Sequence, residues 1–278
     1  MGTLNGTIPE QLERLYRTYN RREFATPDPV EFLYRYEDPA DREIVGLIAS
    51  SLAYGRVRQI KDSVAKILAK MGKTPSRFVR DSSPGLMNRT FSQFRHRFTT
   101  GEEMVGMLLG VHGILYRYGS LNTLFACFFN ESGGMIMPAL CRFAEEVNAG
   151  YDGRRNSLLP SPARGSACKR LHLFLRWMVR RDGVDPGGWS DIPPSALVVP
   201  LDTHMHRVCM GLGLTKRRQA DIKTALEITD AFRKMVPHDP VRYDFVLTRP
   251  GIWRNAGVAF PVDMPTLQHT QERMTNEA

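Results

Sequence analysis

Apolar side chains recur at every third or fourth position through most of this sequence, a spacing typical of amphipathic helices. Ile44, Leu47 and Ile48 form such a stripe, and Gly72 follows another at the position where a glycine often ends a helix. Strand-like alternation is scarce. The pattern predicts an all-α protein with helices in four segments: 41–55, 57–72, 101–119 and 135–150.

Proline, glycine and serine gather in three segments that are predicted to be loops: 74–85, 148–165 and 180–195. A short extended run, SALVVP (195–200), is expected before Pro200, because the residue before a proline disfavours helix. A chain of 278 residues fits one large domain or two smaller lobes.

The chain carries a net charge of +9, which attracts polyanions. Nucleic acid is the commonest such partner, with an anionic membrane surface or a merely solvated basic surface as alternatives. The sequence has no apolar run of membrane-spanning length and no secretory signal, so we expect a cytoplasmic protein without membrane contact. The sequence says nothing of oligomeric state, and a monomer is the default.

The four cysteines are scattered without Cys-x-x-Cys spacing, which argues against a zinc site or an iron–sulfur cluster. We therefore expect reduced thiols, no metal and no cofactor.

The segment SPARGSACKRLHLFLRWMVRRD (161–182) predicts a helix whose apolar stripe includes Leu171, Phe174 and Met178. Ser166 is its expected N-cap, and Lys169 then lies in the first turn. The helix dipole and nearby arginines disfavour a cation there, and a nucleophilic lysine must be neutral. The alternative is that Lys169 is one more solvated lysine.

The segment VVPLDTHMHRVCMGLGLTK (198–216) predicts a helix from about Thr203 to Gly211 or Gly213, with Asp202 at its N-cap. Asp202 has three interpretations. It caps the helix and does nothing more. Held ionised by the hydrogen bonds of a cap, it stabilises a developing cation. In the third, Asp202, His204 and His206 are metal ligands, as in amidohydrolase-type barrels, although the two histidines do not share a helical face.

The segment PLDTHMHRVCMGLGL (200–214) is similar to one in the helix-hairpin-helix DNA glycosylases, which reads approximately (V/L)DTHhxRV. There the aspartate begins a helix that faces the substrate cleft. In the lyase members, the preceding helix carries a lysine in its first turn, after a hairpin that grips DNA phosphate. Lys169 and Asp202 stand in that order here. The hairpin LLPSPARGSACK (158–169) departs from the usual Leu-Pro-Gly-x-Gly turn. An archaeal 8-oxoguanine glycosylase branch has a similarly altered hairpin and a comparably long connection between the lysine and the aspartate.

This resemblance implies an all-α fold of two helical lobes with a cleft, spanning residues 1–260. One lobe is about 1–40 plus 200–260 and the other about 41–199, while 261–278 is expected to be a disordered tail. Lys169 is implied as the nucleophile and Asp202 as the assisting carboxylate of a base-excision repair enzyme, a DNA glycosylase with AP lyase activity. The enzyme would remove a flipped damaged base, with 8-oxoguanine a candidate, from double-stranded DNA.

One glycine and seven basic residues around these segments are candidates for contacts to DNA phosphates. They are Arg164, Gly165, Arg170, Arg176, Arg180, Lys216, Arg217 and Arg218. Trp177 and Trp189 are candidates for stacking on a base, whereas Phe174 is assigned to the core. The segment FRHRF (94–98) interleaves aromatic and basic residues, a pattern that suits a nucleic-acid surface.

The whole chain also resembles a set of bacterial proteins of unknown function, up to about DPVRYDFVLTR (239–249). That resemblance implies no activity. Two other functions therefore stay open beside the glycosylase. One is a helical protein that binds nucleic acid without catalysis, and the other is a metal-dependent hydrolase built on the Asp-x-His-x-His segment.

Overall fold

The computed structural model describes residues 7–152 and 154–255, so the predicted disorder of 261–278 lies outside the described residues. Within the described part the chain is almost entirely helical, which confirms the all-α prediction. The α-helices are α1 (Ile8–Tyr19), α2 (Pro39–Ser51), α3 (Val57–Met71), α4 (Pro75–Asp81), α5 (Pro84–Phe91), α6 (Gly101–Tyr118), α7 (Leu121–Glu131), α8 (Ile136–Asn148), α9 (Lys169–Val179), α10 (Thr203–Gly211), α11 (Ile222–Met235) and α12 (Asp244–Asn255).

The shorter elements in the described residues are one antiparallel hairpin and five 3-10 helices. They are β1 (Arg95–His96), β2 (Thr99–Thr100), η1 (Arg22–Phe24), η2 (Pro29–Arg35), η3 (Ala149–Tyr151), η4 (Pro162–Arg164) and η5 (Pro194–Ala196). None of the helices in the described ranges is long and apolar enough to cross a membrane.

The four predicted helices correspond to α2, α3, α6 and α8. The predicted loop 74–85 is wrong, because it contains α4. Pro75 stands at the start of α4, where its missing N–H costs no hydrogen bond and its fixed φ favours helix. The backbone N–H and the hydroxyl of Ser76 both donate to Asp41 of α2, at 2.8 and 2.7 Å, which fixes the start of α4.

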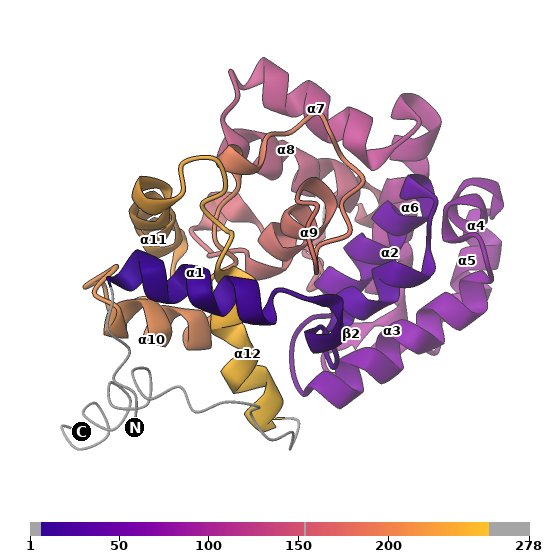
Figure 1. The fold of residues 1–278 in the computed structure, drawn as a ribbon. Coiled ribbons are helices and arrows are strands. Elements are labelled where there is room, and N and C mark those ends of the chain that lie inside the picture. The colour runs from indigo at the N-terminus through magenta and orange to yellow at the C-terminus, as the bar shows by residue number, and fades with distance from the viewer. Residues whose placement is uncertain (1–6, 153, 256–278) are drawn as a thin grey trace.

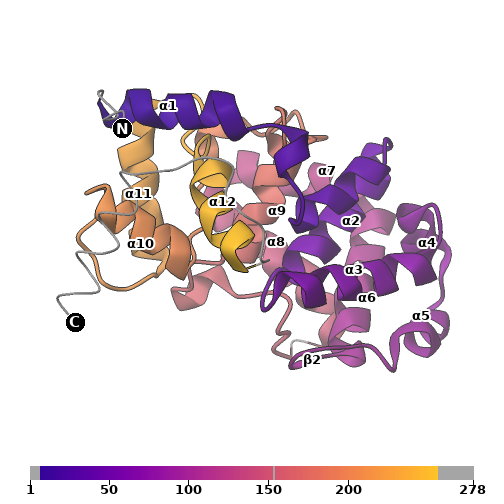
Figure 2. The same cartoon turned by 60° about the horizontal axis from the view of Figure 1, so that its bottom comes forward.

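Helices from the two ends of the described chain lie together. In both Figure 1 and Figure 2, α1, α10, α11 and α12 group at one end of the molecule and α3, α4 and α5 at the other, with α9 between them. One continuous cluster of buried apolar side chains runs through the molecule. Helix α9 therefore lies between these two groups of helices, and its first residue contacts the residue that caps α10.

A close backbone contact holds the segment that leads to α9. Gly110 of α6 lies against α8, and a Cβ there would stand 1.9 Å from the carbonyl oxygen of Val147. Any side chain at position 110 would force the two helices apart. This contact anchors the end of α8, from which residues 149–168 run to the start of α9.

A buried ionic network covers the polar face of α9. Arg176 pairs with Asp185 at 3.1 Å and with Asp244 of α12, while Arg180 pairs with Asp182 at 2.7 Å and also with Asp185. Both arginine side chains are 2–3% exposed. The prediction that Arg176 and Arg180 contact DNA phosphates is therefore wrong. They point away from the apolar stripe, as the helical period requires, but α12 and residues 181–192 cover that face.

His172 lies on α9 one turn after Lys169 and makes the protein sensitive to acid. The side chain is 1% exposed, neither ring nitrogen has a hydrogen-bond partner among the described residues, and burial lowers its pKa to about 4. The unfolded chain takes up this proton below a pH of about 6.5, whereas the folded protein does so only near pH 4. We therefore expect this contribution to stability to be intact above pH 6.5 and to be lost, by about 3 kcal/mol, as the pH falls to 4.

We expect His172→Leu to remove that part of the acid sensitivity. Urea unfolding at pH 7 and pH 4.5 measures it, with His238→Gln as the control because His238 is exposed. If wild type and His172→Leu lose the same stability between the two pH values, His172 is not the cause.

Candidate active site

Lys169 and Asp202 come together although 33 positions separate them. Lys169 is the first residue of α9, and Asp202 is the N-cap of α10. The Lys169 Nζ lies 2.5 Å from the Asp202 Oδ2. The two side chains are 32% and 31% exposed, so the pair is open to a ligand and is not sealed in the core.

The start of α10 explains the position of Asp202. Its Oδ1 accepts a hydrogen bond from the Met205 N–H at 2.8 Å, and its carbonyl accepts one from the His206 N–H at 2.8 Å. These bonds confirm the predicted N-cap. Leu201, just before it, is buried, which fixes the entry of the chain into the helix.

Asp202 stays ionised at neutral pH. Burial alone would raise its pKa, but the Lys169 ammonium and the cap hydrogen bond from Met205 outweigh burial and lower the pKa. A permanent carboxylate is suited to stabilise a nearby positive charge. It is a poor general acid.

A second carboxylate, that of Asp244 on α12, interacts electrostatically with both members of the pair. Asp244 is buried, one of its oxygens pairs with Arg176, and the other has no partner among the described residues. Burial raises its pKa, against the attraction of Arg176. The pattern of the sequence gave no sign of Asp244, because a lone aspartate on an irregular segment carries no motif.

Two exposed loops with predicted phosphate contacts lie side by side near the start of α9. The Ile222 N–H donates to the Gly165 carbonyl at 3.3 Å, and Ser166 forms an isolated bridge with Asp221. These contacts bring the candidates of 164–165 next to those of 216–218. Of these candidates, Arg164, Gly165, Lys216 and Arg218 are exposed and remain phosphate-contact predictions.

The turn before α9 differs from the expectation in one respect. The N-cap of α9 is Cys168, in the left-handed region with φ 45, and not Ser166. The Ser166 hydroxyl accepts from the Cys168 N–H at 3.2 Å and so supports the turn from two residues earlier. Gly165 also adopts a left-handed conformation, φ 78, and Pro162 begins η4 just before it.

Arg170 and Arg217 have structural partners that the sequence did not indicate. Arg170 donates to the carbonyls of Ser51 at 2.8 Å and Ser157 at 2.7 Å. Arg217 donates to Thr224 at 2.8 Å and pairs with Asp221 at 3.0 Å. These guanidinium groups hold parts of the fold together, and both residues are partly exposed, so their assignment as phosphate contacts stays a prediction.

The predicted stacking of Trp177 and Trp189 on a base is wrong, because the two residues are 0% and 4% exposed. Trp189 packs against Phe125 and Phe174, with ring centres 5.7 and 5.2 Å apart, and its N–H donates to Glu43 at 3.1 Å. The assignment of Phe174 to the core is confirmed.

The two histidines of the Asp-x-His-x-His segment do not join Asp202 in a ligand set. The His206 Nε2 lies 2.8 Å from the Arg217 carbonyl and not against Asp202. Across residues 7–152 and 154–255, no group of three or more histidine, cysteine, aspartate or glutamate side chains has the geometry of a metal site. The described residues therefore offer no set of metal ligands for the metal-dependent hydrolase alternative.

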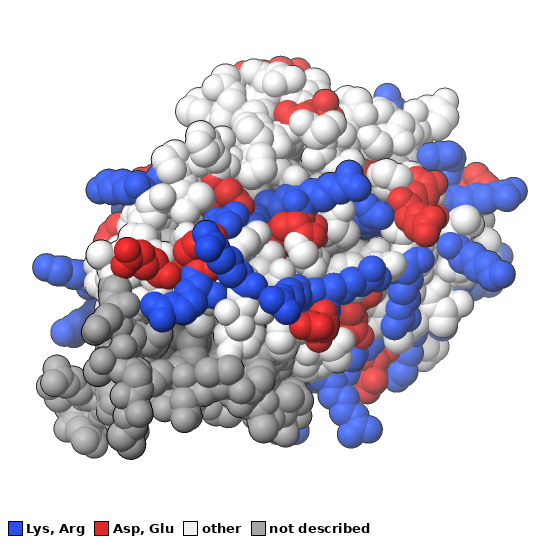
Figure 3. All heavy atoms as spheres, in the orientation of Figure 1, with Lys and Arg blue, Asp and Glu red and all other residues white. Residues whose placement is uncertain are grey.

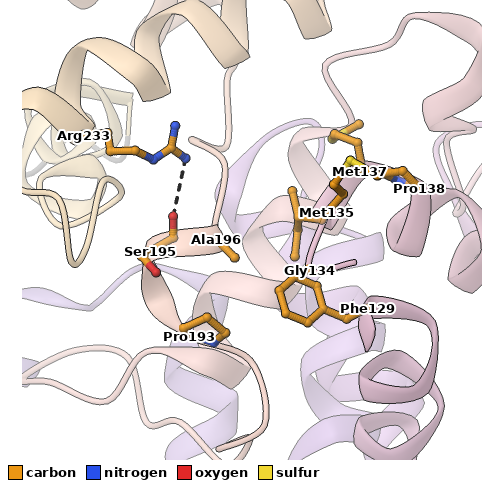
Figure 4. A pocket seen from close by; sticks show the side chains of 10 residues that line it. Phe129, Gly134, Met135, Met137, Pro138, Pro193, Ser195, Ala196 and Arg233 are labelled. Atoms are coloured by element: carbon orange, nitrogen blue, oxygen red, sulfur yellow. Dashed lines mark hydrogen bonds between the residues drawn. The ribbon is translucent and has the colours of Figure 1, made fainter. Parts of the chain in front are cut away.

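An apolar hollow lies away from the pair, between the α7–α8 connection and η5 (Figure 4). Arg233 lies at its edge and donates to the Ser195 carbonyl at 3.4 Å. The other lining residues are Phe129, Gly134, Met135, Ile136, Met137, Pro138, Pro193 and Ala196. They offer no acid, base or nucleophile, so the hollow does not compete with Lys169 and Asp202 as a catalytic site.

Basic side chains are prominent on the surface. Figure 3 shows them in a band across the face seen in Figure 1, with acidic side chains among them. The band agrees with the excess of positive charge in the sequence. It is a surface that attracts polyanions without selecting one.

These observations define an all-α protein in which a lysine and an aspartate, each at the start of a helix, form an accessible ion pair. The chain belongs to the family described as Protein of unknown function (DUF2400), whose model matches residues 28–253. This agrees with the resemblance of the whole chain to proteins of unknown function, and it assigns no activity. Comparison with curated proteins found no match, and comparison with solved structures found none.

Proposed function

We propose that this protein is a DNA glycosylase with AP lyase activity, which uses Lys169 as the nucleophile and Asp202 as an electrostatic stabiliser. The observation that carries the proposal is the direct, accessible contact between these two side chains, 2.5 Å from Nζ to Oδ2, at the starts of two helices. The sequence predicts these two residues as a pair, with Lys169 before Asp202 in the chain. Their juxtaposition is the geometry that the chemistry needs.

The reaction follows from the chemistry of the two groups. The Nζ of Lys169 forms a bond to C1′ of an extruded nucleotide, and the base leaves with the electron pair of the C1′–N bond. The sugar gains positive charge as that bond breaks, and the Asp202 carboxylate lowers the energy of this charge. A proton passes from the bound amine to O4′, the sugar ring opens, and a protonated Schiff base is left between Lys169 and C1′. Loss of a proton from C2′ to water then expels the 3′ phosphate.

Lys169 must lose a proton before it can attack. In the resting protein its ammonium donates to Asp202. The departing base needs one proton, and the Lys169 ammonium is the donor of it. This transfer leaves the Lys169 amine neutral for its attack on C1′ and frees the Asp202 carboxylate to face the positive sugar.

DNA is the proposed partner because the exposed cations flank this pair. Arg164, Lys216 and Arg218 lie on the two adjacent loops beside the start of α9. Contacts to phosphate from such residues position DNA without reading its sequence. We place the protein in the cytoplasm, where its free cysteines stay reduced.

The test is reductive trapping of the Schiff base. The protein is incubated with duplexes that carry 8-oxoguanine, uracil, an oxidised pyrimidine or an abasic site, and borohydride is added in the presence of a chelator. We expect a covalent protein–DNA adduct on at least one duplex, with the DNA attached to Lys169 in peptide mass spectra. Lys169→Ala should give no adduct. Lys234→Ala, which removes an exposed lysine of α11, should trap as the wild type does.

A second function has one observation in its favour. The short contact of Lys169 with Asp202 is also what a purely structural ion pair would make. In that case the protein binds DNA without cleaving it. A shifted duplex without any adduct on the lesions tested indicates this binding protein, and cleavage that the chelator abolishes would indicate metal-dependent hydrolysis.

A further inference from the structure

The β1–β2 hairpin holds an exposed aromatic ring next to two exposed arginines in the sequence. Phe98 is 63% exposed, and Arg95 and Arg97 are exposed as well. His96 and Thr99, by contrast, are 1% and 0% exposed. The base of the hairpin is thus part of the interior while its tip faces solvent, and Figure 2 shows β2 at the edge of the molecule.

The base of the hairpin is fixed by hydrogen bonds on both strands. The His96 ring lies 2.9 Å from the Ser63 hydroxyl through Nδ1 and 3.1 Å from the Tyr54 carbonyl through Nε2. The Thr99 hydroxyl bonds to that of Tyr54 and, at 2.6 Å, to that of Ser157. The tip is therefore held in one place, so that little conformational entropy is lost when it contacts a partner.

Phe98 is the outer member of a stack that leads to the candidate active site. Its ring lies on that of Tyr54, with centres 4.9 Å apart and planes 26° from parallel. The guanidinium of Arg170 lies 5.0 Å from the centre of the Tyr54 ring. Arg170 is the neighbour of Lys169 at the start of α9. Since Tyr54 covers one face of Phe98, the large exposure of Phe98 lies on the rest of its ring.

The turn of the hairpin keeps an arginine in a conformation that favours glycine. Arg97 has φ 55, and it is the first of the two residues between the paired His96 and Thr99. Glycine would adopt this conformation at lower cost. The Arg97 side chain lies beside Gly55, where a Cβ would stand 2.8 Å from the Arg97 Cδ. Arg95, Arg97 and the nearby Arg56 make no ion pair with any residue in the described ranges, although Glu102 of α6 pairs with Arg154 at 3.6 Å close by.

We propose that Phe98 stacks on an unpaired base of DNA, while Arg95 and Arg97 contact the phosphates of the same strand. A fixed aromatic ring with free cations beside it matches the way proteins bind unpaired strands, because every base offers a π-face. The proposal names the substrate class of the site described above, DNA with an unpaired base, and it rests on the proposed function only for the choice of DNA. It needs no reaction at Lys169.

The test measures binding to oligonucleotides with 2-aminopurine at one position. The probes are a single strand, a duplex in which 2-aminopurine is unpaired, a fully paired duplex, and the single strand made of RNA. We expect quenching of 2-aminopurine and tighter binding with the DNA probes that have an unpaired base. Phe98→Ala should weaken that binding roughly tenfold or more and abolish the quenching, whereas Phe98→Trp should keep both.

The matched control is Tyr116→Ala, since Tyr116 is 88% exposed and lies near the far end of α6 from the hairpin. It should bind as the wild type does. Arg97→Gly should lower the dependence of affinity on salt by about one phosphate contact. Equal binding by Phe98→Ala and wild type, binding of the paired duplex alone, or binding of RNA alone would overturn the proposal. Stacking without a trapped Lys169 adduct would support it while the glycosylase proposal fails.

Discussion

Exchange of Asp202 for asparagine is expected to slow base excision by about 10² to 10³-fold while leaving the protein folded and stable. The reason is that asparagine caps a helix as well as aspartate does, so that the bond from the Met205 N–H is kept. The charge is lost. A charge placed where the transition state becomes positive contributes by about this factor in rate.

The measurement is single-turnover excision on the best duplex of the trapping panel, together with thermal unfolding of each variant. Asp38→Asn is the control, because Asp38 caps α2 through the Ala40 N–H at 2.9 Å and lies outside the site. Both variants should melt close to the wild type, and only Asp202→Asn should be slow. An Asp202→Asn protein that excises at the wild-type rate would show that the carboxylate is merely a cap.

The parts of the site that could be predicted are those set by neighbouring residues. The start of α10 follows from Asp202 and the apolar positions after it. The apolar stripe of α9 places Lys169 in the first turn, although the residue that caps this helix is Cys168 and not Ser166. Sequence spacing carries such features because helix period and capping act within one or two turns. That the two side chains touch was an inference from a family resemblance, and no local rule gives it.

The parts that could not be predicted depend on what covers a surface. The helical period places Arg176 opposite the apolar stripe, and on an isolated helix that face would meet water. Its partner Asp244 lies 68 positions later in the chain, and no local sequence pattern predicts that the two residues pair. The same holds for Trp189, which the loop after α9 brings into the core beside Phe125.

The β1–β2 hairpin could be predicted only in part. The interleaving of aromatic and basic residues in 94–98 indicated a surface for nucleic acid, and the alternation of exposed and buried residues fits that interpretation. The sequence did not show that Tyr54, 44 positions before Phe98 in the printed numbering, completes the stack. A pattern of residues predicts which side chains face solvent more readily than which of them meet.

Replacing Arg176 by methionine is expected to destabilise the protein by about 3–5 kcal/mol, the largest effect on stability that we predict. Methionine fills much of the same space, so packing is largely kept. The loss comes from Asp244 and Asp185, which are buried and share this guanidinium. Asp185 retains Arg180, whereas Asp244 is left as a buried charge without its partner.

Protonation of Asp244 would remove the unpaired buried charge, so the loss of stability in Arg176→Met should depend on pH. Burial already raises the pKa of Asp244, and loss of Arg176 removes the main opposing attraction. The deficit of Arg176→Met relative to wild type should therefore shrink as the pH falls from 7 to 5, and the double variant Arg176→Met, Asp244→Asn should recover part of it at pH 7. Urea unfolding of each variant measures these differences.

Arg181→Ala, which removes the exposed neighbour of Arg180, should change stability by about 0.5 kcal/mol or less. A deficit that is independent of pH and unrelieved by Asp244→Asn would mean that Arg176 stabilises the fold by packing and not by charge. In that case an interaction other than the Arg176–Asp244 ion pair would have to hold α12 against α9 and keep Lys169 opposite Asp202.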